Sequence, residues 1–226
     1  MKNVVFDKKH YTSAISNRCL TILEHVPKEN FGGKSMLEIG AGVGLPGGFF
    51  ENLGCTVTSA DGRAENVKEG KVRFPDRQWF ELNFEKSDLS EIVAGQKYDY
   101  ILCLGLLYHL VNPEKVIAEM PEYSDVVFFS GIVCDSDDPD MHYNVREHDE
   151  SKGSQDQHLS GSLGSRFSYV WLENRFKEAG YDVTDITPTK PSSWCTWLHK
   201  GLYDNSGDFR KPKKVGHTRK MYMFKK

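Results

Sequence analysis

Three glycines between a short apolar run and a helical stretch mark the first place in this sequence where ligand chemistry is expected. They lie in the segment LEIGAGVG, residues 37–44. Glycine lets the backbone turn tightly and approach a ligand with no Cβ atom in the way. A dinucleotide fingerprint would need a further glycine where Leu45 stands. Glu38, two residues before the first glycine, disfavours a pyrophosphate and favours a cationic ligand.

Two further polar positions follow the next apolar runs at the spacing of a nucleotide-type site. Asp61 ends the run over residues 55–61, where a carboxylate can accept hydrogen bonds from both hydroxyls of a ribose. Asn83 and Phe84 end the run after it. An amide beside an apolar ring at that edge is suited to bind and cover adenine.

A tyrosine and a histidine follow the fourth apolar run. Tyr108 and His109 come directly after Leu-Gly-Leu-Leu, residues 104–107. Reactants of parallel-sheet enzymes sit over the carboxyl ends of the strands. The imidazole pKa near ~6.5 suits a general base at neutral pH. His109 is therefore the candidate catalytic base and Tyr108 a candidate substrate contact.

The elements that must position these residues alternate between strand and helix. Apolar runs predict strands over residues 35–42, 55–61, 77–84, 98–107, 124–133, 181–188 and 219–226. Helical spacing predicts helices over residues 9–27, 45–53, 64–72, 113–122 and 169–179. Near-continuous apolar strands that alternate with helices indicate an α/β fold with a mostly parallel sheet.

Two segments interrupt this alternation. Residues 135–165 are acidic and rich in Gly and Ser, and predict a long loop or lid with a functional role. Residues 189–216 separate the last two strands as an edge insertion that is expected to fold back onto the domain. The length fits one domain over residues 1–226, with residues 1–34 as an N-terminal helical cap.

These ordered motifs resemble those of the class I S-adenosylmethionine-dependent methyltransferases. The resemblance covers about Ser35 to Pro113 through LEIGAGVG, SADGRAEN, NFE and YDYILCLGLLYHLVNP. The LGLLYHLVNP and DGRAEN versions are most similar to small bacterial and phage methyltransferases whose substrates are largely unassigned. The resemblance implies a Rossmann-like sheet of seven strands, mostly parallel, with helices on both faces and the seventh strand antiparallel.

The resemblance also implies which residues hold the cofactor, S-adenosylmethionine. Glu38 would orient the glycine loop and face the cationic end, and Asp61 would bind the ribose hydroxyls. Asn83 would hold the adenine, although the family commonly has Asp there. The full set of implied cofactor residues is Glu38, Gly40, Ala41, Gly42, Gly44, Asp61, Gly62, Arg63, Asn83, Phe84, Leu104 and Gly105.

What is absent from the sequence narrows the methyl acceptor. The fourth run is followed neither by the Asn/Asp-Pro-Pro-aromatic motif of amino-directed nucleic-acid methyltransferases nor by a Pro-Cys nucleophile. We expect an oxygen or nitrogen of a small-molecule or sugar-type acceptor, contacted by Tyr108, His142 and His148. Acids in residues 135–165 have the chemistry to hold Mg²⁺, but such a run is more typical of a solvated loop, and no metal is assigned.

The distribution of charge is consistent with a second class of acceptor, one that is anionic. The net charge is −3, yet residues 209–226 carry eight Lys and Arg and no acid. A basic rim would serve an anionic substrate such as a phosphorylated sugar, a nucleotide or an RNA, whereas lysines on an edge strand also prevent aggregation. Nucleic acid is therefore an alternative that is not favoured. A non-catalytic, cofactor-binding module also stays open, and a nicotinamide oxidoreductase is disfavoured by Leu45 and Glu38.

Hydropathy and cysteine content bear on location. Mean hydropathy is −0.53, and no apolar run approaches the ~20 residues of a membrane-spanning helix. No secretory leader is expected at the N-terminus. Five scattered cysteines without a Cys-x-x-Cys pair indicate neither a disulfide scaffold nor a zinc cluster. The expected location is a reducing cytoplasm.

Overall fold

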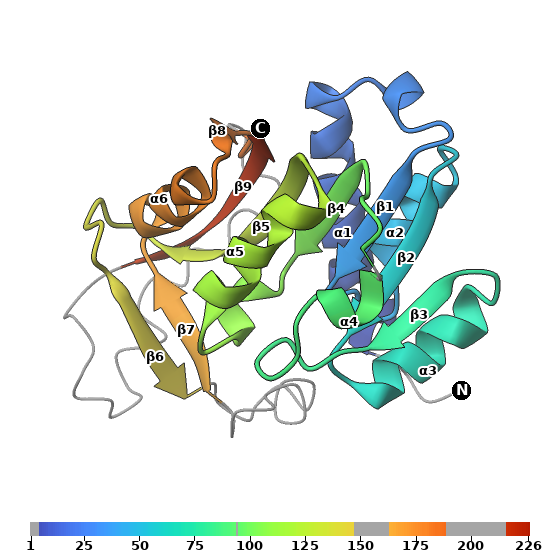
Figure 1. The fold of residues 1–226 in the computed structure, drawn as a ribbon, viewed down its shortest axis with the longest axis horizontal. Coiled ribbons are helices and arrows are strands. Elements are labelled where there is room, and N and C mark those ends of the chain that lie inside the picture. The colour runs from blue at the N-terminus through green and yellow to red at the C-terminus, as the bar shows by residue number, and fades with distance from the viewer. Residues whose placement is uncertain (1–4, 94, 147–162, 189–215) are drawn as a thin grey trace.

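A seven-stranded sheet forms the centre of the molecule (Figure 1). The sheet lies within the residues that the computed structural model describes, which are 5–93, 95–146, 163–188 and 216–226. Its strands are β1 (Ser35–Ile39), β2 (Thr56–Asp61), β3 (Gln78–Glu81), β4 (Tyr100–Leu104), β5 (Val126–Cys134), β8 (Asp182–Asp185) and β9 (His217–Lys225). Their order is β3-β2-β1-β4-β5-β9-β8. Strands β1 to β5 are parallel and β9 is antiparallel to both its neighbours, which confirms the predicted fold class.

Helices cover both faces of this sheet. One face is covered by α1 (Lys9–His25) and α2 (Leu45–Glu51), and the other by α4 (Ser90–Val93), α5 (Pro113–Tyr123) and α6 (Tyr169–Glu178). Helix α3 (Ala64–Arg73) packs on β2 and β3. Short 3-10 turns form η1 (Val5–Asp7), η2 (Lys28–Asn30) and η3 (Leu107–His109). The five predicted helices are confirmed, with ends that differ by one or two residues.

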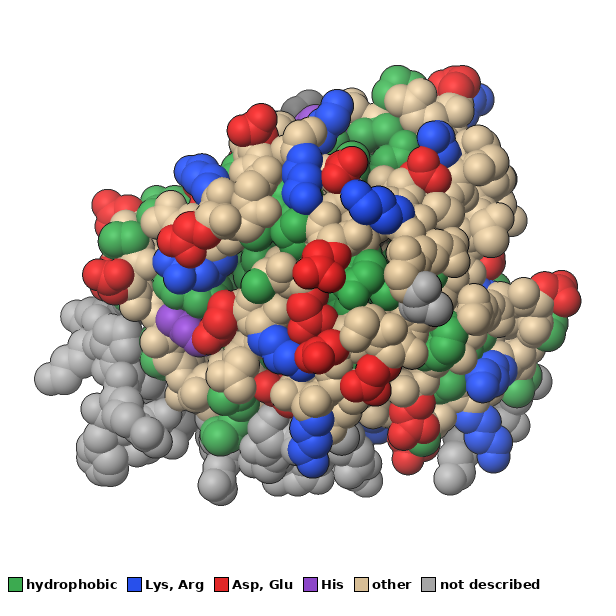
Figure 2. Space-filling view, viewed as in Figure 1, with side chains coloured by type: hydrophobic (Ala, Val, Ile, Leu, Met, Phe, Trp, Pro, Cys, Tyr) green, Lys and Arg blue, Asp and Glu red, His purple; other side chains and the backbone are tan. Residues whose placement is uncertain are grey.

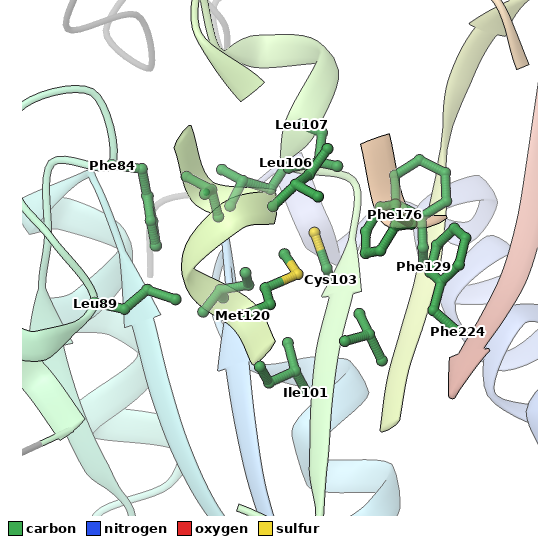
Figure 3. Close-up of a cluster of buried hydrophobic side chains, with 14 of the residues drawn as sticks. Phe84, Leu89, Ile101, Cys103, Leu106, Leu107, Met120, Phe129, Phe176 and Phe224 are labelled. Carbon is green, nitrogen blue, oxygen red and sulfur yellow. The ribbon is translucent and has the colours of Figure 1, made fainter. Parts of the chain in front are cut away.

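The larger core cluster lies between the sheet and helices α5 and α6 (Figure 3). Cys103 of β4 and Phe129 of β5 are fully buried there, together with Met120 of α5. Phe176 of α6 stacks on Phe224 of β9, with ring centroids 3.5 Å apart and an interplanar angle of 3°. This packing holds α6 against β9, the strand that lies between β5 and β8.

A second core cluster lies on the opposite face, against α1. Leu102, Phe128 and Met221 alternate with the residues of the first cluster and pack with Cys19 and Ile22 of α1. Because these strands are buried on both faces, almost every position is apolar, and the strands read as continuous apolar runs.

Part of the segment predicted as a loop over residues 135–165 forms strands instead, one on each side of the residues that are not described. Strands β6 (His142–Arg146) and β7 (Leu163–Phe167) form a separate antiparallel pair. Val145 and Phe167 are 3% and 0% exposed, so the pair is anchored to the core. The run His-Tyr-Asn-Val-Arg holds a single aliphatic residue, and a pattern that short does not reveal a strand. Residues 147–162, which include His148, and residues 189–215 of the edge insertion lie outside the described residues.

The surface over α5 and α6 carries acidic and basic side chains interspersed (Figure 2). Mixed signs of charge are typical of a solvated protein surface. None of the helices in the described part of the chain combines the length and the apolar character needed to cross a bilayer.

Candidate functional site

The predicted cofactor residues meet at one edge of the sheet. The glycine loop (residues 40–44) follows β1, Asp61 ends β2 and Gly105 follows β4, and these three strands are parallel neighbours. The strand order reverses between β1 and β4. Ligands of open parallel sheets bind outside the carboxyl ends of the strands at such a point. Parallel pairing therefore assembles a candidate ligand site from segments far apart in the sequence.

The glycine loop adopts a backbone that only glycine takes readily. Its three glycines have φ of 66°, 57° and 81°, in the left-handed region. A Cβ atom on Gly40 would lie 2.8 Å from the Cβ of Leu106, and one on Gly44 would lie 2.3 Å from Nη1 of Arg77. The amide of Ala41 donates to a β2 carbonyl at 3.0 Å. Close approach, as well as the turn, explains the glycines.

Asp61 holds the glycine loop from the neighbouring strand. Its Oδ2 accepts from the Gly42 amide at 2.7 Å. Its Oδ1 accepts from the Arg63 amide at 3.0 Å and from Asn66 Nδ2 at 2.9 Å. The residue is 7% exposed, and burial raises the pKa of the Asp61 carboxyl despite these hydrogen bonds. Two carboxylate oxygens offer about four acceptor positions, and these three donors, all from described residues, use three of them.

Glu38 lies beneath the loop and accepts hydrogen bonds from neighbouring protein groups. Its Oε1 accepts from the Gly47 amide of α2 at 2.9 Å, and its Oε2 accepts from Ser59 Oγ at 2.7 Å. The residue is buried, and this burial raises the pKa of the Glu38 carboxyl. Glu38 therefore orients the start of α2, and its predicted contact with a cationic ligand stays a prediction.

Arg77 is not among the predicted site residues, yet it joins the glycine loop to α2. Its side chain is 0% exposed. Nε and Nη2 donate to the two carboxylate oxygens of Glu51 at 2.8 and 2.7 Å. Nη1 donates to the Gly44 carbonyl at 2.9 Å and lies 3.3 Å from Oε2 of Glu38. The guanidinium carbon lies 3.9 Å from the Phe74 ring centre. Arg77 neutralises the buried acid under the loop.

The N-terminal segment reaches the same loop. A Cβ atom on Gly42 would lie 2.9 Å from the Phe6 ring, so that ring lies directly on the loop backbone. Asp7 accepts from Nη1 and Nη2 of Arg73 in α3 at 2.7 and 2.9 Å. This ion pair holds η1 across the edge of the sheet. No sequence motif around Phe6 or Asp7 predicted that they would contact the glycine loop and α3.

The residues predicted to lie along the adenosine follow β2, and those predicted to hold the adenine follow β3. Gly62 and Arg63 are half-buried beside Asp61, and Asn83 is half-buried after β3. The side-chain oxygen of Asn83 accepts from the Glu85 amide at 3.1 Å. Phe84 is 3% exposed and lies at one end of the core cluster (Figure 3). Phe84 therefore supports this edge from within the core, and adenine binding by these residues stays a prediction.

The predicted acceptor residues gather where β4 ends. The strand stops at Leu104 because Gly105, with φ of 118°, turns the chain into η3. A Cβ atom on Gly105 would lie 3.5 Å from the Tyr108 hydroxyl and 3.8 Å from Nη1 of Arg18. The rings of Tyr108 and His109 are 4.2 Å apart between centroids. Tyr108 thus adjoins Gly105, one of the predicted cofactor residues, and His109 lies beside Tyr108.

His142, a predicted substrate contact, lies on β6 against helix α6. Its ring centroid is 4.6 Å from that of Trp171. Its Nε2 atom is buried, without a hydrogen-bond partner among the described residues, and burial lowers the pKa of the imidazole. Over the described ranges, no group of three or more His, Cys, Asp or Glu is arranged to hold a metal ion. A substrate role for His142 stays a prediction.

Comparison with known proteins places this geometry among methyltransferases. A family model described as a methyltransferase domain matches residues 11–186. The ubiquinone biosynthesis O-methyltransferase of Salmonella paratyphi A is 29% identical over 103 residues, which is 43% of this chain and 42% of that protein. The protein of that name from Coxiella burnetii (strain Dugway 5J108-111) is 28% identical over 104 residues, 44% of each chain. The chain thus matches less than half the length of these relatives.

Solved structures share the fold over nearly the whole chain. The N-terminal domain of EvdMO1, crystallised with S-adenosylhomocysteine, has a TM-score of 0.69 at 17% identity and covers 96% of this chain and 84% of its own. A Burkholderia thailandensis 1,6-didemethyltoxoflavin-N1-methyltransferase, with 1,6-didemethyltoxoflavin and S-adenosylhomocysteine bound, has a TM-score of 0.57 at 15% identity. It covers 96% of this chain and 81% of its own. At these identities the likeness shows the fold alone.

Proposed function

Because this chain belongs to the methyltransferase domain family, we propose that it transfers the methyl group of S-adenosylmethionine to an oxygen or nitrogen of a small-molecule or sugar-type acceptor. The observation that carries the proposal is the edge formed by the glycine loop, Asp61 and Gly105. When bound, the cofactor supplies an electrophilic methyl group on a sulfonium. The chain has to bind it, orient it and exclude water.

The residues at this edge fit that cofactor. Asp61 would accept from the ribose hydroxyls in addition to its bonds from Gly42, Arg63 and Asn66. The three glycines with positive φ hold the turn of the glycine loop, whose backbone would lie along the cofactor. Phe6 covers the loop from the N-terminal segment and would shield it from water.

The acceptor would lie over η3, beside Gly105. The Tyr108 hydroxyl points to that glycine, where it would contact the acceptor. His109 adjoins Tyr108 and would take the proton that the acceptor oxygen or nitrogen loses. Positioning of the acceptor in line with the methyl group accounts for much of the rate in such a transfer.

The relatives support a small-molecule acceptor without deciding its atom. The curated relatives are O-methyltransferases by name, whereas the solved Burkholderia thailandensis neighbour is an N1-methyltransferase. RNA or nucleotide methylation stays an alternative, as does a module that binds the cofactor without turnover.

Calorimetric titration with S-adenosylhomocysteine tests the proposal. Wild type is expected to bind, and Asp61→Ala to bind about tenfold or more weakly, because a charged hydrogen-bond partner of the ribose is removed. Asp185→Asn is the matched control, since Asp185 is an exposed acid paired with Lys220 on β9. Folded wild type that does not bind S-adenosylhomocysteine would overturn the proposal.

A further inference from the structure

Three arginines from three separate elements converge on the end of β4. Arg18 comes from α1, and its Nη1 donates to the Leu104 carbonyl at 2.9 Å. Arg166 comes from β7, and its Nη1 donates to the Tyr108 carbonyl at 3.3 Å. Arg219 comes from β9, with its guanidinium carbon 5.9 Å from the centre of the Tyr108 ring. We call Arg18, Arg166 and Arg219 the arginine cluster.

The arginine cluster is largely withdrawn from solvent. Arg18 is 9% exposed and Arg166 is 2% exposed. Burial of a guanidinium is costly, and cations held close together repel one another. Burial, and next the charge of Arg219, lower the pKa of Arg18 to about 10. Such a concentration of positive charge is expected where an anion binds.

A buried hydroxyl faces the same side of the sheet as Arg219. The pairing of β5 with β9 sets Arg219 opposite Ile132, and Ser130 lies two residues earlier on β5, so both side chains project to the face that α1 covers. Nη1 of Arg219 and Oγ of Ser130 are buried with no hydrogen-bond partner in the part of the chain that the structure describes. Buried polar groups are nearly always hydrogen-bonded, so two of them on one face point to an oxygen-rich ligand.

The basic C-terminal segment divides at this point. Arg219 projects toward Tyr108 and α1, whereas the next residue, Lys220, projects to the opposite face and pairs with Asp185 at 2.6 Å. A continuous basic rim would present both residues to one partner. The structure instead directs one cation to the candidate site and the other to a surface ion pair.

We propose that the methyl acceptor carries an anionic oxygen group, a carboxylate or a phosphate, which the arginine cluster binds beside Tyr108. The fork of a guanidinium matches the oxygens of either group and binds it in a fixed orientation. The position beside Gly105 would set the rest of the acceptor against the methyl group. This inference rests on the proposed function, because it names the acceptor class for that same site.

Matched small probes test the inference on the full chain saturated with S-adenosylhomocysteine. Benzoate and benzamide share a shape but differ in charge, and phenyl phosphate presents the other anion. By calorimetry we expect benzoate or phenyl phosphate to bind at least about tenfold more tightly than benzamide, with affinity that falls as salt rises. The tighter of the two anions identifies the group.

Variants separate a built site from general charge. Arg219→Gln and Arg166→Gln are expected to weaken the anion by about tenfold or more, and Arg219→Lys by less because it keeps the charge. Lys220→Gln removes the same charge from the same strand on its opposite face and should leave anion binding unchanged. Arg219 is partly exposed, so its variants still test the site if Arg166→Gln does not fold.

Several outcomes would overturn the inference. The inference fails if wild type binds the anions and benzamide with equal affinity. It also fails if Arg219→Gln binds the anion as tightly as wild type does, or if Lys220→Gln loses as much anion affinity as Arg219→Gln. The titration with S-adenosylhomocysteine distinguishes failure of the proposed function from failure of the acceptor class. If folded wild type does not bind it, the proposed function fails and the acceptor class fails with it. If it binds but no anion is preferred, the acceptor class alone fails.

Discussion

Replacement of Arg77 by methionine should destabilise the fold strongly, because Arg77 is the counterion of a buried acid. The side chains of Arg77 and Glu38 are 0% and 3% exposed. Methionine would leave the Glu38 carboxylate and the Gly44 carbonyl against an apolar side chain. Methionine keeps most of the length of the arginine stem, so the substitution mainly removes charge and donors.

The magnitude follows from what is left unpaired. Removal of one partner from a buried ion pair costs about 3–5 kcal/mol. The contact with Glu51 adds less, because that carboxylate is 29% exposed and solvent screens it. At roughly 2–4 °C per kcal/mol for a chain of this size, Tm should fall by about 6–20 °C. Arg175→Met is the matched control, and should cost about 1 kcal/mol or less, since Arg175 and Glu178 are 36% and 58% exposed.

The charge on Glu38 can be tested separately through pH. Burial raises the folded-state pKa of Glu38 above its ordinary value of 4.5, and loss of Arg77 removes the main effect that opposes this rise. An acid with a raised folded-state pKa binds a proton on folding, so stability increases as pH falls through that pKa toward the unfolded value. Arg77→Met should therefore recover stability relative to wild type on acidification. Glu38→Gln in the same chain should recover part of the loss at neutral pH.

Urea denaturation followed by circular dichroism, from about pH 8 to about pH 5, measures these effects as free energies of unfolding. The reasoning is refuted if Arg77→Met lies within about 1 kcal/mol of Arg175→Met, since a buried ion pair cannot be lost that cheaply. It is equally refuted if Glu38→Gln recovers nothing, because the cost would then not come from an uncompensated carboxylate.

Three further predictions concern the loop, the base and β6. Gly42→Ala should weaken binding of S-adenosylhomocysteine in calorimetry, because φ of 57° and the Phe6 ring leave no room for a Cβ atom; unchanged affinity would contradict this. His109→Gln should lower turnover by about 100-fold or more and leave cofactor affinity intact, measured as product release with an accepted substrate. Burial lowers the pKa of His142 below its ordinary value of 6.5, so stability present above that pH should be lost as pH falls below it. His142→Phe should flatten this part of the Tm-against-pH curve, and an unaltered slope would argue against it.

The strands and helices could be predicted because the sheet is buried on both faces. Leu102 and Cys103 are neighbours on β4 and project to opposite core clusters, yet both are fully buried. Such a strand has no polar side, so its apolar run stands out against the helices around it. The turn at the glycine loop could also be predicted from the sequence. Its three closely spaced glycines have positive φ, a conformation that glycine adopts most readily.

The β6–β7 pair could not be predicted, because each strand is short and its partner is distant. Val145 is the only aliphatic residue in β6, and its partner across the pair is Gly164. Phe167, on the other strand, is fully buried and anchors the pair to the core. Its ring packs on that of Trp171 in α6. A local pattern of apolar residues carries no information about such a contact.

The charged residues that shape the site were missed for a related reason. Arg18 contacts Leu104, 86 residues away, and Arg166 contacts Tyr108, 58 residues away. Hydrophobic periodicity over windows of about 11–18 residues shows which face of a helix or strand is buried. It cannot show which distant residues that face will contact. Of these two arginines, only Arg18 could be recognised in the sequence, as a charge within the apolar stripe of α1 that includes Cys19. Motifs can therefore point to the cofactor side of such a site, while the acceptor side depends on contacts that only the folded chain creates.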